Sequence, residues 1–278
     1  MSRLTSSSSN YTRHIRPSEG SAPTSVEMVF RPVNLVFLDE KSQTMNLRIE
    51  LILNWTDSQL AWNPLDYDDI QRIYFSESAM WLPPIQLANS LVKTHPLRNA
   101  DGVIPISADG GIEWTLQENS LTSCDIDISF YPFDVQTCSI QISFYPMSPE
   151  DLDVISKVHL GRNFDSGGSW QAIHADCSIF WARLRNEMEY KFHFTFRRRS
   201  TFYVLKIILP VTFLSFTATA VFLLPPESGE KMGVAITVLL AYSVYLSIIA
   251  DNLPQTSVQI CYLQVYLTSP ASSSLCGC

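Results

Sequence analysis

A stripe of residues late in the chain changes its chemistry in a regular order. Steps of three and four positions pass through carboxylate, small, hydroxyl, apolar, hydroxyl and carboxylate side chains, namely Glu230, Gly233, Thr237, Leu240, Val244, Ser247 and Asp251. This spacing places them on one side of an α-helix. Copies of such a helix around an axis would form a pore whose acidic rings concentrate cations and whose apolar constriction closes by dewetting. Helices that pack in a protein core also show such stripes, so both interpretations stay open here.

Side chains that could support catalysis are scattered along the sequence. The histidines form no motif, and neither HExxH nor a glycine-rich phosphate-binding loop is present. We therefore predict that the protein is not an enzyme and uses no metal or cofactor. The formal net charge of −8 argues against nucleic acid as a partner, because a phosphate-binding surface needs clustered Lys and Arg.

The distribution of apolar residues divides the chain into two halves. Before about residue 200, short segments are interrupted by Pro, Gly, Asn and Ser. After it, Phe202–Leu224 and Met232–Ala250 are apolar runs that are long enough to cross a bilayer. The link Pro225-Pro226-Glu227-Ser228-Gly229 favours a turn between them. We therefore predict membrane helices at about 202–224 and 232–252 that form a hairpin.

Alternation of apolar and polar residues predicts several short strands in the first half. It runs from Met45 to Trp55, from Cys138 to Phe144 and from Tyr190 to Phe196, which is typical of strands with one buried face. Turn signals such as Asn63-Pro64 and Asp109-Gly110-Gly111 separate such runs. This pattern favours an antiparallel sandwich or barrel over a parallel α/β sheet. The predicted fold class is an antiparallel β-sandwich followed by a transmembrane helical hairpin.

Two cysteines, Cys124 and Cys138, enclose thirteen residues that include Tyr131-Pro132-Phe133-Asp134. By spacing alone, they could form an ordinary disulfide staple of a sandwich. The segment resembles the signature loop of the Cys-loop receptor family, and other motifs of that family stand in the right order along the chain. They are Trp55-Thr56-Asp57 with Leu60 and Trp62-Asn63, Trp81-Leu82-Pro83, Arg198 to Tyr203, and PPESGEKM. From about Asn10 to about Ser257, the chain resembles the acetylcholine-receptor branch of the family.

The resemblance implies a subunit of a pentameric, neurotransmitter-gated, cation-selective ion channel in the plasma membrane, at a postsynaptic site. It implies a polar segment at 1–25, an extracellular ligand-binding sandwich at 26–200, membrane helices at 201–255 and a truncated or aberrant tail at 256–278. The expected partners are a small-molecule agonist such as an acetylcholine-like cation, other subunits in a homo- or hetero-pentamer, the lipid bilayer and the permeating cations.

The resemblance also implies roles for individual residues. The paired cysteines would form a disulfide, and a loop of this size contributes roughly 3 kcal/mol in the loop-entropy model. The loop tip from Tyr131 to Asp134 would lie on the membrane domain and couple ligand binding to gating. Arg198 would pair with a buried acid, for which Glu40 and Asp39 are the candidates. From sequence alone, Arg197–Arg199 could instead be basic residues that flank a membrane helix.

The match fails where the family binds cationic agonists in an aromatic box. Tyr145 occupies the place of the central box aromatic, but Ala88 and Glu50 stand where Tyr and Trp are expected. The segment from Cys177 to Tyr190 lacks the adjacent cysteine pair of acetylcholine-binding principal subunits. Tyr145 is thus the candidate ligand-binding residue of a non-principal or divergent subunit. The alternative is a non-conducting, truncated subunit that acts as a ligand-binding or dominant-negative interaction protein.

Two N-glycosylation sequons bear on the orientation of the first half. Asn10-Tyr11-Thr12 is the predicted site, whereas Asn54-Trp55-Thr56 lies in a predicted strand with a buried Trp55 and is not expected to be used. A disulfide and a glycan place this half outside the cell, although the arginines before the first apolar run favour the opposite orientation. No secretory signal peptide is visible in the first thirty residues. Either the first membrane helix acts as an internal signal or the natural chain starts elsewhere, and we favour the second explanation.

Overall fold

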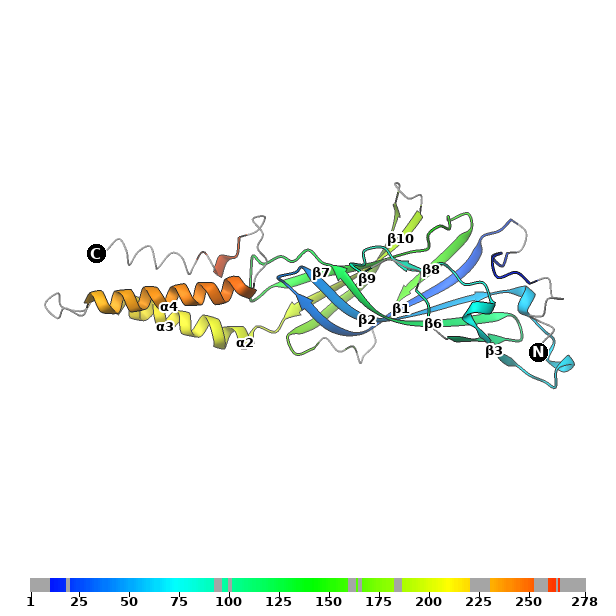
Figure 1. Ribbon diagram of the computed structural model, residues 1–278, viewed down its shortest axis with the longest axis horizontal. Helices are drawn as coiled ribbons and strands as arrows, with labels where there is room; N and C mark the ends of the chain where they lie inside the picture. The colour runs from blue at the N-terminus through cyan, green and yellow to red at the C-terminus, as the bar shows by residue number, and fades with distance from the viewer. Residues whose placement is uncertain are drawn as a thin grey trace.

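The computed structural model is elongated, with a β-sandwich at one end and two helices side by side at the other (Figure 1). It describes residues 11–18, 21–92, 97–99, 102–159, 164, 167–182, 187–220, 231–252, 260–263 and 265.

The described residues form ten strands in two sheets. The strands are β1 (Thr24–Asp39), β2 (Thr44–Thr56), β3 (Arg72–Ser76), β4 (Gln86–Leu87), β5 (Val103–Ser107), β6 (Gly111–Ser123), β7 (Val135–Ser143), β8 (Leu152–Val158), β9 (Trp170–Ala182) and β10 (Glu187–Arg198). The six-stranded sheet has the order β3-β5-β6-β2-β1-β8, and the four-stranded sheet has the order β4-β7-β10-β9. Paired strands are antiparallel except β1 and β8, which run in parallel.

The predicted strands coincide with parts of β2, β7 and β10, with Phe144 one residue beyond the end of β7, and this confirms the sandwich expected from the alternating pattern. In β2, every second residue from Met45 to Trp55 is apolar and buried, while the residues between them are more exposed. The two sheets meet through aromatic rings, since Phe30 of β1 stacks on Phe192 of β10 with their centroids 4.2 Å apart. Both rings are fully buried. The core therefore lies between the sheets and fixes their relative position.

Short turns close one end of the sandwich. The 3₁₀ turns are η1 (Ser58–Leu60), η2 (Pro64–Asp66) and η3 (Glu77–Ala79). Gly110, in the turn before β6, has a φ of +84°, and a Cβ there would lie 2.4 Å from the carbonyl oxygen of Asp57. Only glycine fits this turn, because other residues rarely adopt that φ and would collide with the neighbouring backbone.

The chain leaves the sandwich at Arg198 and enters the helices at once. These are α2 (Thr201–Tyr203), a π-helical turn η4 (Val204–Ile208), α3 (Leu209–Ala220) and α4 (Lys231–Asn252). Thr201–Ala220 and Met232–Ile249 are long and apolar enough to cross a membrane, and 17% of each span is buried in the protein. Most of their apolar surface is therefore left uncovered by the described part of the chain. The predicted turn at 225–229 lies outside the described residues.

The contact between the sheets should dominate the stability of the sandwich. Replacing Phe192→Ala removes a fully buried ring and should lower the free energy of unfolding by roughly 3–5 kcal/mol. Ile179→Ala on the neighbouring strand is the control, because Ile179 is half exposed and the change should stay within about 0.5 kcal/mol. Thermal unfolding of the detergent-purified chain, followed by tryptophan fluorescence, measures both. If both variants lost the same free energy of unfolding, this account of the core would be contradicted.

Candidate functional site

The loop between β6 and β7 lies at the junction of the sandwich and the helices. It is closed by the expected disulfide between Cys124 and Cys138, whose Cα atoms are 5.1 Å apart. Tyr131 is buried, whereas Phe130 and Phe133 are 66% and 60% exposed. The loop therefore turns one aromatic residue inward and presents two outward at the end of the sandwich.

Arg198, the last residue of β10, is the centre of a buried charge cluster. Its Nε and Nη2 donate to the two carboxylate oxygens of Asp134 at 2.7 and 3.0 Å. Its Nη1 lies 2.5 Å from Oε1 of Glu40. Asp39, the other candidate, instead accepts hydrogen bonds from the turn residues that follow it, among them the Ser42 hydroxyl at 2.7 Å. The arginine side chain is only 1% exposed, so its charge depends on these carboxylates.

Three aromatic rings complete the surroundings of the guanidinium group. Their centroids lie 4.2 Å (Trp170), 5.0 Å (Tyr131) and 5.1 Å (Tyr203) from its central carbon. Such ring faces attract a cation. Burial opposes the charge of Arg198, but the bonds to Asp134 and Glu40 outweigh it and raise its pKa above the ordinary value. Burial, reinforced by the adjacent Tyr203, raises the pKa of Tyr131, so that phenol stays neutral.

The same cluster reaches the first helix. Tyr203 belongs to α2, and its hydroxyl accepts a hydrogen bond from Nη1 of Arg198 at 3.2 Å. Its ring also packs edge-on against Tyr131, with their centroids 5.5 Å apart. Five segments of the chain therefore meet at one point, namely the β1–β2 turn, the disulfide loop, β9, β10 and α2. We call this the junction cluster, and its members are Glu40, Tyr131, Asp134, Trp170, Arg198 and Tyr203.

A second contact joins the loop to the segment that follows α4. The backbone N–H of Tyr262 donates to the carbonyl of Ser129 at 3.2 Å. The ring of Tyr262 lies 5.4 Å from that of Phe130. The disulfide loop thus contacts chain that comes both before and after the two long helices.

Of the three aromatic members of the cluster, Tyr131 was predicted from the sequence, whereas Trp170 and Tyr203 were not. Tyr203 ends the Arg198 to Tyr203 motif, but nothing in the sequence assigned it a contact. Trp170 follows the Gly167-Gly168 turn, and it reaches the cluster because β9 pairs with β10 in a register that sets Trp170 opposite Arg198. The signal available in the sequence was a tryptophan in the strand that comes before the strand of Arg198.

The helix α4 has two different faces. Val238, Tyr242 and Ile249 are buried, and the Tyr242 hydroxyl lies 2.6 Å from the hydroxyl of Ser215 in α3. The described side chains of the predicted stripe are all exposed, namely Gly233, Thr237, Leu240, Val244 and Ser247. At 100° per residue, the stripe lies on the side opposite the buried face. Glu230 and the side chain of Asp251 lie outside the described residues.

The residues described at the positions of the family's agonist box are either solvent-exposed or charged. Tyr145 follows β7 and is 54% exposed. Glu50 lies in β2, where its carboxylate pairs with Nη1 of Arg31 at 2.6 Å and accepts from Gln117 at 3.3 Å. An ion pair thus stands where an aromatic residue was expected. Asn10, the predicted glycosylation site, lies outside the described residues.

Comparisons with known proteins agree with this architecture. The family model of the neurotransmitter-gated ion-channel ligand binding domain matches residues 1–200, and that of the neurotransmitter-gated ion-channel transmembrane region matches residues 207–269. The chain is 30% identical over 277 residues to acetylcholine receptor subunit gamma of Gallus gallus, covering 93% of this chain and 54% of that protein. It is 32% identical over 262 residues to acetylcholine receptor subunit beta-type unc-29 of Caenorhabditis elegans, covering 92% and 52%.

A neuronal relative gives the same result. The chain is 30% identical over 272 residues to neuronal acetylcholine receptor subunit alpha-6 of Rattus norvegicus, covering 93% of this chain and 54% of that protein. It thus spans about half the length of the curated relatives it matches. The two family models cover nearly all of the sandwich and helices described above. The chain therefore belongs to the neurotransmitter-gated ion-channel family and is nicotinic acetylcholine receptor-like.

Proposed function

We propose that the chain is a subunit of a pentameric, cation-selective channel that an extracellular neurotransmitter opens. The exposed stripe on α4 is the observation that carries this proposal. The sandwich would lie outside the plasma membrane of a postsynaptic cell, and the helices within the bilayer. In this division, residues 26–200 bind ligand and residues 201–255 form the membrane part.

The dimensions and chemistry of α4 suit a pore. Its 22 residues span about 33 Å, close to the roughly 30 Å of a hydrocarbon core. The Thr237 hydroxyl donates to the carbonyl of Gly233 at 2.8 Å, so its lone pairs remain available to a passing cation. Leu240 and Val244 would narrow the water column, and carboxylates at Glu230 and Asp251 would concentrate cations at its two mouths.

The junction cluster supplies a mechanism for coupling. A buried arginine that loses a partner is costly, so Arg198 and Asp134 should move as one unit. Movement of the disulfide loop would then displace Arg198, and through Tyr203 it would displace the start of α2. Through the contact between Phe130 and Tyr262, the loop would also displace the segment that follows α4.

The ligand-facing residues support a subunit that contributes only part of an agonist site. Tyr145 offers an exposed ring that could face a cationic ligand. Glu50 is already held by Arg31 and offers no ring. A neighbouring subunit would therefore have to provide the remaining aromatic residues, which favours assembly with different subunits.

Removing one charge from the junction tests the coupling. Asp134→Asn leaves Arg198 with a single carboxylate, and loss of a buried partner should destabilise the chain by about 3–5 kcal/mol. Agonist-evoked current per surface channel should fall as well. Asp151→Asn is the control, because Asp151 pairs with Arg16 at the surface and its loss should change neither quantity. Thermal unfolding, surface biotinylation and current recording measure these effects, and an Asp134→Asn channel that behaves as the parent would refute the coupling.

Accessibility of the stripe tests the pore. The chain is co-expressed with a full-length relative, and a cationic thiol reagent is applied with agonist. Thr237→Cys should let the reagent block the current, whereas Ile249→Cys should not, because Ile249 is fully buried. Leu240→Thr should let the channel open at lower agonist concentration, since a polar ring weakens dewetting. No block at Thr237→Cys, with suppression of the relative's own current, would favour the non-conducting alternative.

A further inference from the structure

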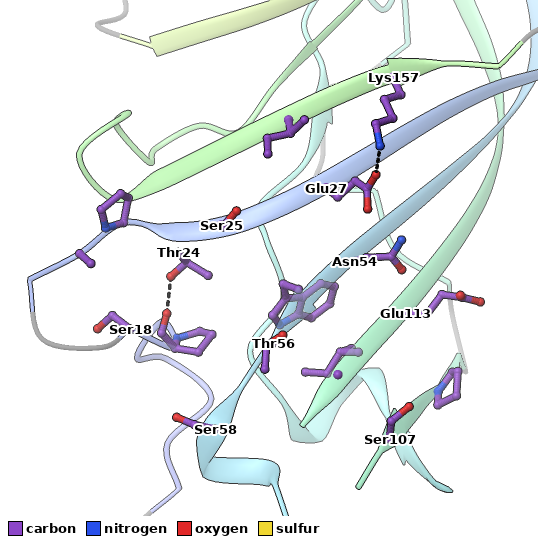
Figure 2. A pocket seen from close by; sticks show the side chains of 18 of the residues that line it. Ser18, Thr24, Ser25, Glu27, Asn54, Thr56, Ser58, Ser107, Glu113 and Lys157 are labelled. Atoms are coloured by element: carbon purple, nitrogen blue, oxygen red, sulfur yellow. Dashed lines mark hydrogen bonds and ion pairs between the residues drawn. The ribbon is translucent and has the colours of Figure 1, made fainter. Parts of the chain in front are cut away.

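The outward face of the six-stranded sheet carries its charges in separate rows that cross β1, β2 and β6. One row holds Glu27, Asn54 and Glu113, and Figure 2 shows the two carboxylates on either side of Asn54. Lys157 of β8 pairs with Glu27 at 2.5 Å. The next row towards the junction cluster is uncharged and consists of Val29, Ile52 and Thr115. It separates the acidic row from the rows that contain arginine.

The arginine rows carry an excess of positive charge. Their members in the strand register are Arg31, Glu50 and Gln117, followed by Asn34, Arg48 and Asn119. Two arginines and one glutamate give these rows a net charge of +1. Glu50 lies four residues from Asn54 along β2, which is about 13 Å in a strand and more than the screening length of roughly 8 Å in physiological salt. The acidic row therefore does little to offset this charge.

Hydrogen bonds hold the two guanidinium groups in one network across the strands. Nη1 of Arg31 donates to Oε2 of Glu50 at 2.6 Å. The amide nitrogen of Gln117 donates to the other oxygen of Glu50 at 3.3 Å. The amide oxygen of Gln117 accepts from Nη2 of Arg48 at 3.2 Å. Glu50 and Gln117 therefore orient both arginines.

The guanidinium groups face outward more than the carboxylate does. The side chain of Arg31 is 42% exposed and that of Glu50 is 17% exposed, and Arg48 is exposed as well. A guanidinium group has five N–H donors in a planar fork. Among the described residues, the side-chain bonds of these two groups use only Nη1 of Arg31 and Nη2 of Arg48. Both arginines therefore keep donors for a ligand at this face.

This arrangement suits a negative group better than a cation. Glu50 stands where the resemblance to the family leads one to expect an aromatic ring of the agonist box. A quaternary ammonium group at this place would meet the excess positive charge instead of the negative face of a ring. A carboxylate would match the fork of an arginine and gain charge-assisted hydrogen bonds, which are stronger than neutral ones.

We propose that the agonist bound at this face is a zwitterion whose carboxylate is recognised by Arg31 and Arg48. Its ammonium group would lie against aromatic rings of the neighbouring subunit, such as the exposed Tyr145 where that neighbour is a second copy of this chain. Glu50 and Gln117 act as positioning residues for the two arginines. The inference rests on the proposed function, because only assembly into a channel makes this face part of an agonist site.

Matched acids and esters test the carboxylate. The probes are glycine, γ-aminobutyrate and trimethylglycine, each compared with its methyl ester, which lacks the negative charge. The chain carries Thr237→Cys and is co-expressed with a full-length relative, so the current that the cationic thiol reagent removes belongs to channels that contain this chain. The measurement is the concentration of each probe that evokes half of this reagent-sensitive current.

We expect at least one acid to evoke reagent-sensitive current. Adding Arg31→Gln should raise the required concentration of that acid by about tenfold, the scale of one charge-assisted hydrogen bond, and should leave that of its ester unchanged. Arg31→Lys keeps the charge without the fork and should have a smaller effect. Lys157→Gln is the control, because Lys157 lies on the same face in the acidic row, and it should change neither concentration.

The other outcomes separate the inference from the proposed function. If Arg31→Gln weakens an acid and its ester equally, or if only esters evoke reagent-sensitive current, the carboxylate site is wrong and the pore stands. Equal weakening with fewer channels at the surface, measured by biotinylation, would assign the arginines to contact between subunits instead. If the reagent removes no current with any agonist, the proposed function fails and the agonist site fails with it.

Discussion

A positive charge buried at the end of the sandwich constrains the rest of the molecule. Taking an ion out of water costs several kcal/mol, which only well-placed partners can offset. Arg198 obtains them from Asp134 in the disulfide loop, from Glu40 in the turn after β1, and from rings on β9 and α2. These segments lie far apart in the sequence and can satisfy the charge only together. The sandwich and the first helix are therefore joined by a cluster that resists partial rearrangement.

The helices beyond this cluster are held more loosely. In a bilayer, apolar side chains gain little by packing against each other, so polar contacts and close packing position the helices. The hydroxyl pair of Ser215 and Tyr242 is one such contact between α3 and α4. It fixes the buried face of α4 and leaves the stripe on the other side, where Leu240 is 64% exposed. In the proposed channel, a rigid junction above this helix pair would let a small displacement of the sandwich change the pore.

Local patterns in the sequence predicted the structural features that depend on a single strand or helix. Alternation identified β2 and β10 because each strand buries a single face, and the apolar runs identified the two helices. The parallel pairing of β1 with β8 was missed, since it joins segments more than one hundred residues apart. The choice between Asp39 and Glu40 was equally out of reach, because it depends on which of two adjacent carboxylates binds the Ser42 turn. The contact of Trp170 with Arg198 depends on a strand register that the sequence does not encode locally.

The second sequon, Asn54-Trp55-Thr56, shows how alternation acts on three successive residues of a strand. In a strand, positions one and three of Asn-x-Thr point to the same face, and position two points to the other. A large apolar residue at position two therefore directs the acceptor amide and the hydroxyl outward when it enters the core. Trp55 is buried, whereas Asn54 is half-buried and Thr56 is exposed, as this alternation requires. The alternation that predicts the strand thus also determines on which face of the sheet its sequon lies.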